Sequence, residues 1–525
     1  MFKKFLLHLG WTFLVFVILF VPDVLYTLWK FPTYFTFVPE SFFKQFAAIF
    51  FIIFFVLMIP QRRSRFAILT ILALFSLAEQ LHFVYYHNYI SPYKIKLFFQ
   101  EQEEIWQTVK EIYRYFFLPL FFFLVQLFLL HKIAKRPAPL EFRYALPISI
   151  LLLAAGPIVA FTRNDAYVFM PKTTNVSIAN MYTTLSWFLS HELFKPKKRV
   201  HFQPYRVEEL PDIRSPQNII VVMGESLGSN KMSLFGFDKN TTPNLDALKN
   251  DPRFLFGSGY ACSVCTKVSL PTFFTLKAEP ANIAPILDNT TNLARLAKAR
   301  GYKVHYITMQ NSMLLSGYIS GYADSITELK GYDEKLIEAL EKIDLSRKNF
   351  IILHQRNSHS PYHEYTPPRF YKFPFKERPY EEFMLFSYLN SVLYTDYILS
   401  SIFKKVKELD SSAIAFFTSD HGELIGIKED KGKFGHSILD PNAAKVPFLI
   451  YYNDKVDPSI QKMVSTLPTI HTHYQFGKLI ARTLGYAIVN PNENNESFYI
   501  NGTDLAGENG YMVLYRNRQE YKIVH

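Results

Sequence analysis

Polar residues that suit a metal ion follow two apolar runs in the second half of the sequence. Glu225 follows "NIIVVMG", and Asp420 and His421 follow "AIAFFTS". Two carboxylates and an imidazole suit zinc or a similar divalent ion, which stays catalytic when one coordination position is open to a reacting group. A lone Glu after a strand is usually a helix cap or a solvated residue, but the adjacent Asp and His of "DHGE" rarely serve packing. The combination therefore favours a catalytic metal site.

The elements that must position these residues are predicted strands. Short β-branched or aromatic runs alternate with helical stretches, and they lie at 218–223, 302–308, 349–354, 413–418 and 446–452. This alternation is typical of an α/β domain with a mainly parallel sheet. Ligands of such sheets bind beyond the carboxyl ends of the strands. We therefore expect the polar residues that follow three of these strands, His359 among them, to meet at one edge of the sheet.

The first part of the chain has a different character, with long apolar runs. Hydrophobic residues make up 49% of the 525 residues, and 51 of the residues are Phe. Crossing ~30 Å of hydrocarbon takes about 20 residues of helix. Five segments meet this length, at 5–28, 41–59, 65–86, 114–131 and 144–162. The first is too long for the apolar region of a signal peptide and no A-x-A-like cleavage site follows it, so we expect an uncleaved span.

Lys and Arg in the short connections predict the orientation of these spans. They precede the first span, join the second and third around Arg62, and join the fourth and fifth between Lys132 and Arg143. With these sides cytoplasmic, everything after residue 162 lies outside, in a periplasm or at a cell surface. The formal net charge of +12 then reflects this topology signal and the basic segment 195–199, which suits a linker near anionic headgroups or a solvated one. The outward location argues against a nucleic-acid partner.

The sequence therefore predicts three parts. Residues 1–162 form a transmembrane domain of five helices, and residues 214–525 form a catalytic domain. Residues 163–213 between them contain the amphipathic run "VSIANMYTTLSWFLSHELF", which we expect as a helix lying on the membrane surface and connecting the two domains.

Four segments together resemble the motif series of bacterial phosphoethanolamine transferases, which belong to the alkaline phosphatase and sulfatase superfamily. They are "GESLGSNKMSLFGFDKNTTPNLD" at 224–246, "CTKVSLPTFF" at 265–274, "HQRNSHSPY" at 354–362 and "TSDHGE" at 418–423. The five-span anchor before the outer domain is also similar to theirs. The resemblance thus covers nearly the whole chain.

The resemblance implies roles for individual residues. A zinc ion would be held by four side chains, those of Glu225, Thr266, Asp420 and His421. Thr266 would also be the nucleophile. His359 and His436 resemble the histidines that serve the substrate phosphate and the leaving group in that family.

The implied reaction has two steps. Thr266 attacks the phosphorus of phosphatidylethanolamine and diacylglycerol leaves, and an acceptor then displaces the threonine. A Thr hydroxyl has a pKa far above 7, so the attack requires activation by a base or a metal. If Thr266 opens a helix through "SLPTFFTL", the positive end of that helix adds stabilisation of anions. Either His359 or His436 suits protonation of the departing oxygen.

A lipid donor explains the membrane anchor, because donor and catalytic site must meet at the outer face of the same membrane. The acceptors implied by the resemblance are envelope glycoconjugates such as lipid A, the lipooligosaccharide core or other periplasmic acceptors. We expect a monomeric, multi-pass protein of the bacterial inner membrane, with its N-terminus in the cytoplasm and its catalytic domain in the periplasm.

Three other functions remain in competition. A sulfatase requires the C-x-P-x-R pattern from which formylglycine is made, but Cys265 is followed by Thr-Lys-Val-Ser. A glycerolphosphate transferase of the lipoteichoic acid synthase type shares the anchor, the fold and the Thr nucleophile, and only "MSLFGFDKNTTPNLD" favours phosphoethanolamine transfer. A non-catalytic membrane scaffold with a decayed domain would have lost at least one of the four zinc-site residues.

Cys262 and Cys265, the only cysteines of the chain, lie directly before Thr266. The C-x-x-C spacing suggests redox chemistry or zinc, but no second cysteine pair completes a zinc site and the βαβ context of a thioredoxin-like motif is missing. Outside the cytoplasm a disulfide between the two is plausible. We expect such a bond to stiffen the turn that presents Thr266.

Glu79 and His82 lie in the outward third of the third span. Ionisable residues in a span are costly and often functional. The sequence leaves two roles open for them, contact with the ammonium group of the donor or snorkelling to the membrane interface.

Overall fold

The structure, a computed structural model, describes most of the chain. The described residues are 2–30, 37–86, 89–90, 92–100, 102–163, 169, 171–172, 175–194, 202–494, 496–505, 507, 509–516 and 520–524. They form two compact units, Met1–Lys198 and Arg199–His525. The basic segment 195–199, for which the sequence suggests a membrane-proximal linker, lies outside the described residues.

The described part of the first unit contains helices and no strand. Its elements are α1 (Phe2–Lys30), α2 (Pro39–Leu57), α3 (Arg62–Tyr86), α4 (Pro92–Gln100), α5 (Gln102–Ile112), η2 (Tyr113–Phe116), α6 (Phe117–Lys135), α7 (Ala145–Thr162), α8 (Ser177–Phe188) and η4 (Leu189–Phe194). Among the described residues, five helical segments are long and apolar enough to cross a membrane, at Phe2–Leu25, Pro39–Leu57, Arg62–Phe83, Tyr113–Lys135 and Ala145–Thr162. The predicted five-helix organisation is confirmed.

Large apolar side chains stand outward on α6 in a helical stripe. Phe117, Phe121, Leu124 and Phe128 are each more than half exposed, and their spacing of three or four residues places them on one side of the helix. Such a stripe is unfavourable in water and favourable in hydrocarbon. Helix α6 therefore has the surface of a helix that faces lipid.

Helix α8 corresponds to the predicted amphipathic helix, and it packs against α3 and α7. The carboxylate of Asp23 in α1 accepts a hydrogen bond from the backbone N–H of Ser177 at 3.0 Å, which satisfies one of the free N–H groups at the start of α8. Glu79 in α3 is buried and accepts a hydrogen bond from Ile90 N at 2.8 Å. Glu79 thus bonds the backbone of Ile90, and its contact with a donor lipid stays a prediction.

The second unit is built on a seven-stranded sheet with the order β3-β10-β7-β2-β6-β4-β5. These strands are β2 (Asn218–Gly224), β3 (Phe254–Tyr260), β4 (Lys303–Thr308), β5 (Ser325–Glu328), β6 (Asn349–His354), β7 (Ala413–Ser419) and β10 (Lys445–Tyr452). The five strands from β7 to β5 run parallel, whereas β10 is antiparallel to β7 and β3 is antiparallel to β10. The predicted mainly parallel sheet is confirmed.

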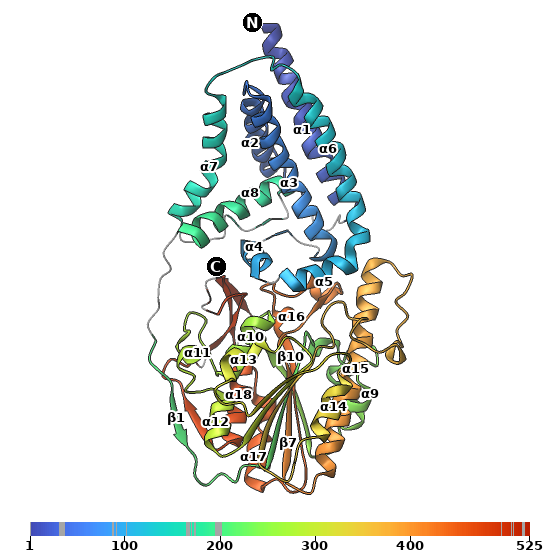
Figure 1. The fold of residues 1–525 in the computed structure, drawn as a ribbon, viewed down its shortest axis with the longest axis vertical. Coiled ribbons are helices and arrows are strands. Elements are labelled where there is room, and N and C mark those ends of the chain that lie inside the picture. Colours follow the sequence, from blue (N-terminus) through green and yellow to red (C-terminus); the bar gives the residue numbers. More distant parts are fainter. Residues whose placement is uncertain are drawn as a thin grey trace. The chain divides into compact units, whose positions relative to one another are not determined.

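The central strands are apolar runs because both faces of the sheet are covered. Every residue of β2, β6 and β7 is buried. The helices of this unit are α9 (Pro243–Ala247), α10 (Thr266–Phe274), α11 (Ala284–Asp288), α12 (Leu293–Ala299), α13 (Met313–Ile319), α14 (Glu334–Glu341), α15 (Tyr380–Glu408), α16 (Pro441–Ala444), α17 (Pro458–Val464) and α18 (His473–Thr483). Figure 1 shows α12, α13 and α18 on one side of the sheet and α9, α14 and α15 on the other.

Three small sheets complete the second unit. They are formed by β1 (Arg206–Glu209) with β11 (Tyr486–Val489), by β8 (Leu424–Ile425) with β9 (Phe434–Gly435), and by β12 (Ser497–Asn501), β13 (Tyr511–Tyr515) and β14 (Tyr521–Val524). A single backbone bridge joins Ser263, in the loop before α10, to Asn501 at the end of β12. The C-terminal sheet is thereby tied to the loop that precedes Thr266.

Candidate metal and nucleophile site

The carboxyl ends of β2, β6 and β7 meet at one edge of the sheet. In the register of the parallel strands, Gly224 of β2 lies opposite Ser419 of β7. Glu225 and Asp420 each follow the member of that pair on their own strand, so they leave the sheet side by side. This is the position at which ligands bind in open α/β sheets.

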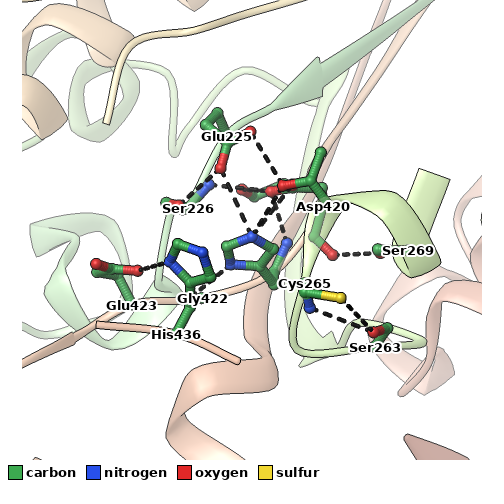
Figure 2. A network of polar contacts seen from close by, with 12 residues as sticks. Glu225, Ser226, Ser263, Cys265, Ser269, Asp420, Gly422, Glu423 and His436 are labelled. Carbon is green, nitrogen blue, oxygen red and sulfur yellow. Dashed lines mark hydrogen bonds and ion pairs between the residues drawn. The ribbon is translucent and has the colours of Figure 1, made fainter. Parts of the chain in front are cut away.

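Glu225, Asp420 and His421 form a compact group at this edge. One ligand atom from each lies within 4.8 Å of the others, and all three side chains are buried. The His421 Nε2 atom lies 3.6 Å from Glu225 Oε1 and 3.3 Å from Asp420 Oδ2. Figure 2 shows the carboxylates of Glu225 and Asp420 directed into the same space.

Neighbouring groups hold these side chains in a form that suits a cation. The His421 Nδ1 atom lies 2.9 Å from Gly422 O, and because a carbonyl only accepts, Nδ1 carries the proton and Nε2 offers its lone pair to the site. Asp420 Oδ1 accepts hydrogen bonds from the backbone N–H groups of Ser226 and His421, at 3.0 and 2.8 Å. Asp420 Oδ2 is buried and has no hydrogen-bond partner among the described residues.

This donor set fits a zinc ion. Two carboxylates, one imidazole lone pair and a hydroxyl are ligands that zinc takes, and a buried carboxylate oxygen without a donor is costly unless a cation compensates it. Asp420 Oδ2 is such an oxygen, and it is directed at the group. The residues present therefore fit the metal that the sequence suggested.

Thr266 brings its hydroxyl to this group from helix α10. The helix begins at Thr266, as expected if that residue opens it, and Cys265 precedes it in extended conformation. Thr266 Oγ1 lies 3.2 Å from His421 Nε2 and 3.4 Å from Glu225 Oε2. The hydroxyl of Ser269, in the next turn of α10, donates to the backbone oxygen of Asp420 and fastens the helix to the site. The free N–H groups of the helix start add favourable potential for an anion.

His436 lies beside the metal group, and a carboxylate that the sequence analysis did not single out holds it. This carboxylate is that of Glu423, the last residue of "DHGE", and its Oε2 atom lies 3.0 Å from His436 Nδ1 (Figure 2). Glu423 is buried, and its other oxygen accepts a hydrogen bond from the hydroxyl of Tyr362 at 2.7 Å. A carboxylate only accepts, so His436 Nδ1 is the protonated nitrogen. Glu423, His421 and His436 also form a second group with metal-ligand spacing.

His359 is brought to the same place by the loop after β6. Its ring lies 6.2 Å from the ring of His436, which in turn lies 4.4 Å from the ring of His421. The Nδ1 atom of His359 is bonded to Ser360 O, and the side chain is buried. The structure thus gathers all the residues that the sequence proposed for metal and substrate, although those residues span more than two hundred positions.

Gln310 is a further residue that the sequence analysis missed. It lies two residues beyond β4, and its Nε2 atom donates to Glu225 Oε2 at 2.7 Å and to Gln355 O at 2.8 Å. His354 lies against the same amide, 3.0 Å away, and burial lowers its pKa to about 4, so it is neutral at pH 7. The only signal for Gln310 was its place after a predicted strand, a place that many solvated residues share.

The disulfide suggested between Cys262 and Cys265 is not formed, and both residues are buried free thiols. The thiols are directed at different partners, because Cys262 Sγ lies 3.3 Å from Ser269 O inside α10 and Cys265 Sγ lies 3.9 Å from Gly502 O. Burial raises the pKa of Cys262 to about 12. The turn before Thr266 is therefore held by packing and hydrogen bonds.

Comparison with known proteins relates the second unit to a known family. The family model described as Sulfatase matches residues 217–480. The chain is 27% identical to the Kdo(2)-lipid A phosphoethanolamine 7''-transferase of Salmonella typhimurium over 312 residues, which are 54% of each chain. It is 25% identical to the phosphoethanolamine transferase EptA of Helicobacter pylori over 268 residues, 45% of this chain and 48% of that protein. The chain thus spans about half the length of the curated relatives it matches.

The full-length fold also has a solved counterpart. The structure is similar to the integral membrane protein lipooligosaccharide phosphoethanolamine transferase A of Neisseria meningitidis, with a TM-score of 0.59, 16% sequence identity, and coverage of 91% of this chain and 95% of that one. At 16% identity the similarity shows the fold alone. In this chain the fold consists of apolar helices at the N-terminus followed by an α/β unit.

Proposed function

The chain belongs to the sulfatase family. From that premise we propose that it is a zinc-dependent transferase, which moves phosphoethanolamine from phosphatidylethanolamine to an acceptor of the bacterial envelope. One observation carries the proposal, the position of the Thr266 hydroxyl 3.2 Å from His421 Nε2 at the start of a helix. A hydroxyl nucleophile beside a metal group suits phosphoryl transfer. The relatives named as phosphoethanolamine transferases support the group that is transferred.

Glu225, Thr266, Asp420 and His421 would hold the zinc ion. When bound, zinc lowers the pKa of a coordinated hydroxyl and neutralises charge on phosphoryl oxygens. The chain's own residues supply the rest: Asp420 keeps one oxygen free of donors, and Gly422 O fixes the His421 tautomer.

In the first half-reaction, the Thr266 hydroxyl gives its proton to solvent, Thr266 Oγ bonds to phosphorus, and the bond from phosphorus to the diacylglycerol oxygen breaks. His436 Nε2 delivers a proton to the departing oxygen, while Glu423 holds Nδ1–H and steadies the imidazolium form. His359, 6.2 Å from His436 between ring centres, binds the phosphoryl oxygens. The product is a phosphoethanolamine ester of Thr266.

In the second half-reaction, an acceptor hydroxyl or phosphate takes the place of diacylglycerol. His436 now receives the proton of the acceptor, since the two halves are chemically the reverse of each other. The bond from Thr266 Oγ to phosphorus breaks, and Oγ regains a proton from solvent, which restores the hydroxyl.

The donor lipid gives a reason for the helical unit. We place the protein in the bacterial inner membrane as a monomer, with its N-terminus in the cytoplasm, residues 1–162 spanning the membrane and residues 214–525 in the periplasm. The outward apolar stripe of α6 and the Lys and Arg of the short connections support this placement. Residues 163–213 connect the two domains.

The acceptor is proposed from the relatives. Two of them are named for transfer to Kdo(2)-lipid A, in Salmonella typhimurium and in Escherichia coli. We propose a lipid A, lipooligosaccharide core or similar envelope glycoconjugate as acceptor for this chain.

The test is a transfer assay with the full-length protein in vesicles. Vesicles contain lipid A and one of two donors, phosphatidylethanolamine or phosphatidylglycerol, each with an isotopic label in its headgroup. The proposal predicts labelled lipid A and released diacylglycerol with phosphatidylethanolamine alone. Transfer only from phosphatidylglycerol would instead establish a glycerolphosphate transferase. No transfer from either donor, with zinc bound, would contradict the proposal and favour a non-catalytic scaffold.

A further inference from the structure

One residue of the C-terminal sheet makes three hydrogen bonds to the loop that carries the nucleophile. We call residues 262–265 the nucleophile loop, because they lead directly into Thr266. The Asn501 side-chain Nδ2 and its backbone N–H both donate to Cys262 O, each at 2.8 Å. The backbone oxygen of Asn501 accepts from Val264 N at 3.2 Å. Asn501 thus contacts the loop on both sides of Ser263.

A buried lysine fixes the orientation of the Asn501 amide. Lys277 Nζ donates to Asn501 Oδ1 at 3.1 Å and to Pro280 O at 3.2 Å, and the side chain is only 1% exposed. An ammonium group has no acceptor, so Oδ1 must face Lys277 and Nδ2 must face Cys262 O. Both hydrogen-bond partners of Nζ are neutral oxygens, which makes the buried cation costly for the fold.

The surroundings of Lys277 destabilise its protonated form. Burial lowers the pKa of Lys277 to about 8, against the opposing charges of Glu279 and Asp504 and of the Cys262 thiol when ionised. A hydrocarbon side chain at this place would avoid the cost of burying a charge. A costly cation directed at the Asn501 amide, which itself holds the nucleophile loop, indicates a role beyond packing.

The opposite side of the loop is joined to the histidine that serves the leaving group. Val264 O accepts a hydrogen bond at 2.8 Å from the backbone N–H of Ser437, the residue after His436. The loop therefore lies between Asn501 and the His436 segment. A shift of the loop would move Thr266 relative to both His421 and His436.

We propose that Asn501 and Lys277 are positioning residues for the nucleophile, acting through the nucleophile loop without touching the substrate. The inference rests on the proposed function, in which Thr266 attacks the donor. A misplacement of about 1 Å costs on the order of 100-fold in rate, so a loop held by hydrogen bonds on both sides supports catalysis. The small C-terminal sheet then helps to position the nucleophile.

The first test measures how often the nucleophile loop opens, and it needs no substrate. Cys262 and Cys265 are the only cysteines of the chain and both are buried, so their rate of alkylation by iodoacetamide in the native full-length protein reports opening of the loop. Asn501→Ala removes the side-chain hydrogen bonds and is expected to raise this rate about tenfold. The matched control is Ser497→Ala, since Ser497 is buried in the same strand and bonds Asn494, not the loop.

The second test separates positioning from binding. In the vesicle assay, Asn501→Ala is expected to lower kcat by about 10- to 100-fold and to leave KM within about twofold, because positioning affects the reacting group and not donor binding. Lys277→Met should give a similar loss. The double variant should lose no more than Asn501→Ala alone, because both changes remove the same constraint. Lys277→Gln keeps an N–H donor and should retain most of kcat even where Lys277→Met folds poorly.

The outcomes are distinct. Unchanged alkylation in Asn501→Ala, an equal acceleration in Ser497→Ala, or losses of kcat that multiply in the double variant would each overturn the positioning role. If the wild-type protein transfers nothing, the proposed function fails, while the alkylation rates still decide whether Asn501 holds the loop.

Discussion

The Nδ1 atom of His436 lies 3.0 Å from the carboxylate of Glu423, and this contact orients the imidazole that we propose as the proton donor. Glu423 is itself held by the hydroxyl of Tyr362. In the proposed mechanism the Nε2 atom of His436 serves the leaving group. The pairing of carboxylate and imidazole is a recurrent way to set the tautomer of a catalytic histidine.

Replacing Glu423 by Gln should slow transfer without loss of fold. Glu423→Gln keeps the shape of the side chain but removes the charge that stabilises protonated His436, so kcat should fall by about 10- to 100-fold, the range seen for residues that orient a catalytic group. Steady-state transfer in vesicles measures it. Tyr362→Phe, which removes only the hydroxyl that holds Glu423, should lose less; a larger loss in Tyr362→Phe than in Glu423→Gln would contradict this order.

Gln310 should contribute to the affinity for zinc. The amide of Gln310 donates to Glu225 Oε2 at 2.7 Å, so Gln310→Leu releases one proposed ligand from its orientation. We expect zinc binding to weaken by about 10- to 100-fold. Competition with a chromophoric chelator measures the dissociation constant. Gln461→Leu is the control, because the side chain of Gln461, on helix α17, donates to Val456 O and to no proposed ligand. An equal loss of zinc affinity in Gln461→Leu would contradict the role of Gln310.

The stability of the second unit should fall on acidification below neutral pH. Burial lowers the pKa of His473 to about 3 and that of His354 to about 4, from an ordinary value of 6.5. Between 6.5 and these values the unfolded chain binds protons that the folded chain does not, so stability is complete above pH 6.5 and declines as the pH drops. Each histidine gives a slope of about 1.4 kcal/mol per pH unit within its window.

Scanning calorimetry of the full-length protein at pH 7 and pH 5 measures this decline. His473→Gln should reduce the difference between the two pH values, since Gln can still bond Thr418 and Cys262 N without gaining a proton when unfolded. A difference of the same size in wild type and His473→Gln would mean that other groups carry the pH dependence.

Reducing agents should have no effect on the protein. Cys262 and Cys265 are free thiols directed at different partners, so dithiothreitol should change neither the thermal midpoint nor the transfer rate. Under non-reducing conditions, a thiol reagent should find two thiols per chain after unfolding. Fewer than two would show that the bond exists, and a drop in midpoint on reduction would show that it stabilises the fold.

The parts of the site that lie on strand ends were predictable from sequence. Glu225 and Asp420 follow continuous apolar runs, and a sheet that is covered on both faces requires such runs, so the residues after them had to lie at one edge. The direction of β10 was not predictable, because an apolar run is the same whether the strand is parallel or antiparallel.

The supporting residues depend on tertiary contacts that no local pattern encodes. Gln310 lies 85 positions from Glu225, and Asn501 lies 239 positions from the carbonyl that it binds. For Cys262 and Cys265 the local pattern was misleading, since their spacing suggested a disulfide and the structure shows two thiols. The roles of Thr266, His359 and His436 came from the family resemblance, and they remain proposals that the geometry supports.

The central claim is that Thr266 carries the phosphoethanolamine group between donor and acceptor. Intact-mass analysis of the zinc-loaded full-length protein, after incubation with phosphatidylethanolamine and without acceptor, measures this most directly. The account predicts a gain of one phosphoethanolamine group in wild type and in Thr272→Ala, a matched change on the same helix α10, and no gain in Thr266→Ala. An adduct that persists in Thr266→Ala would contradict it.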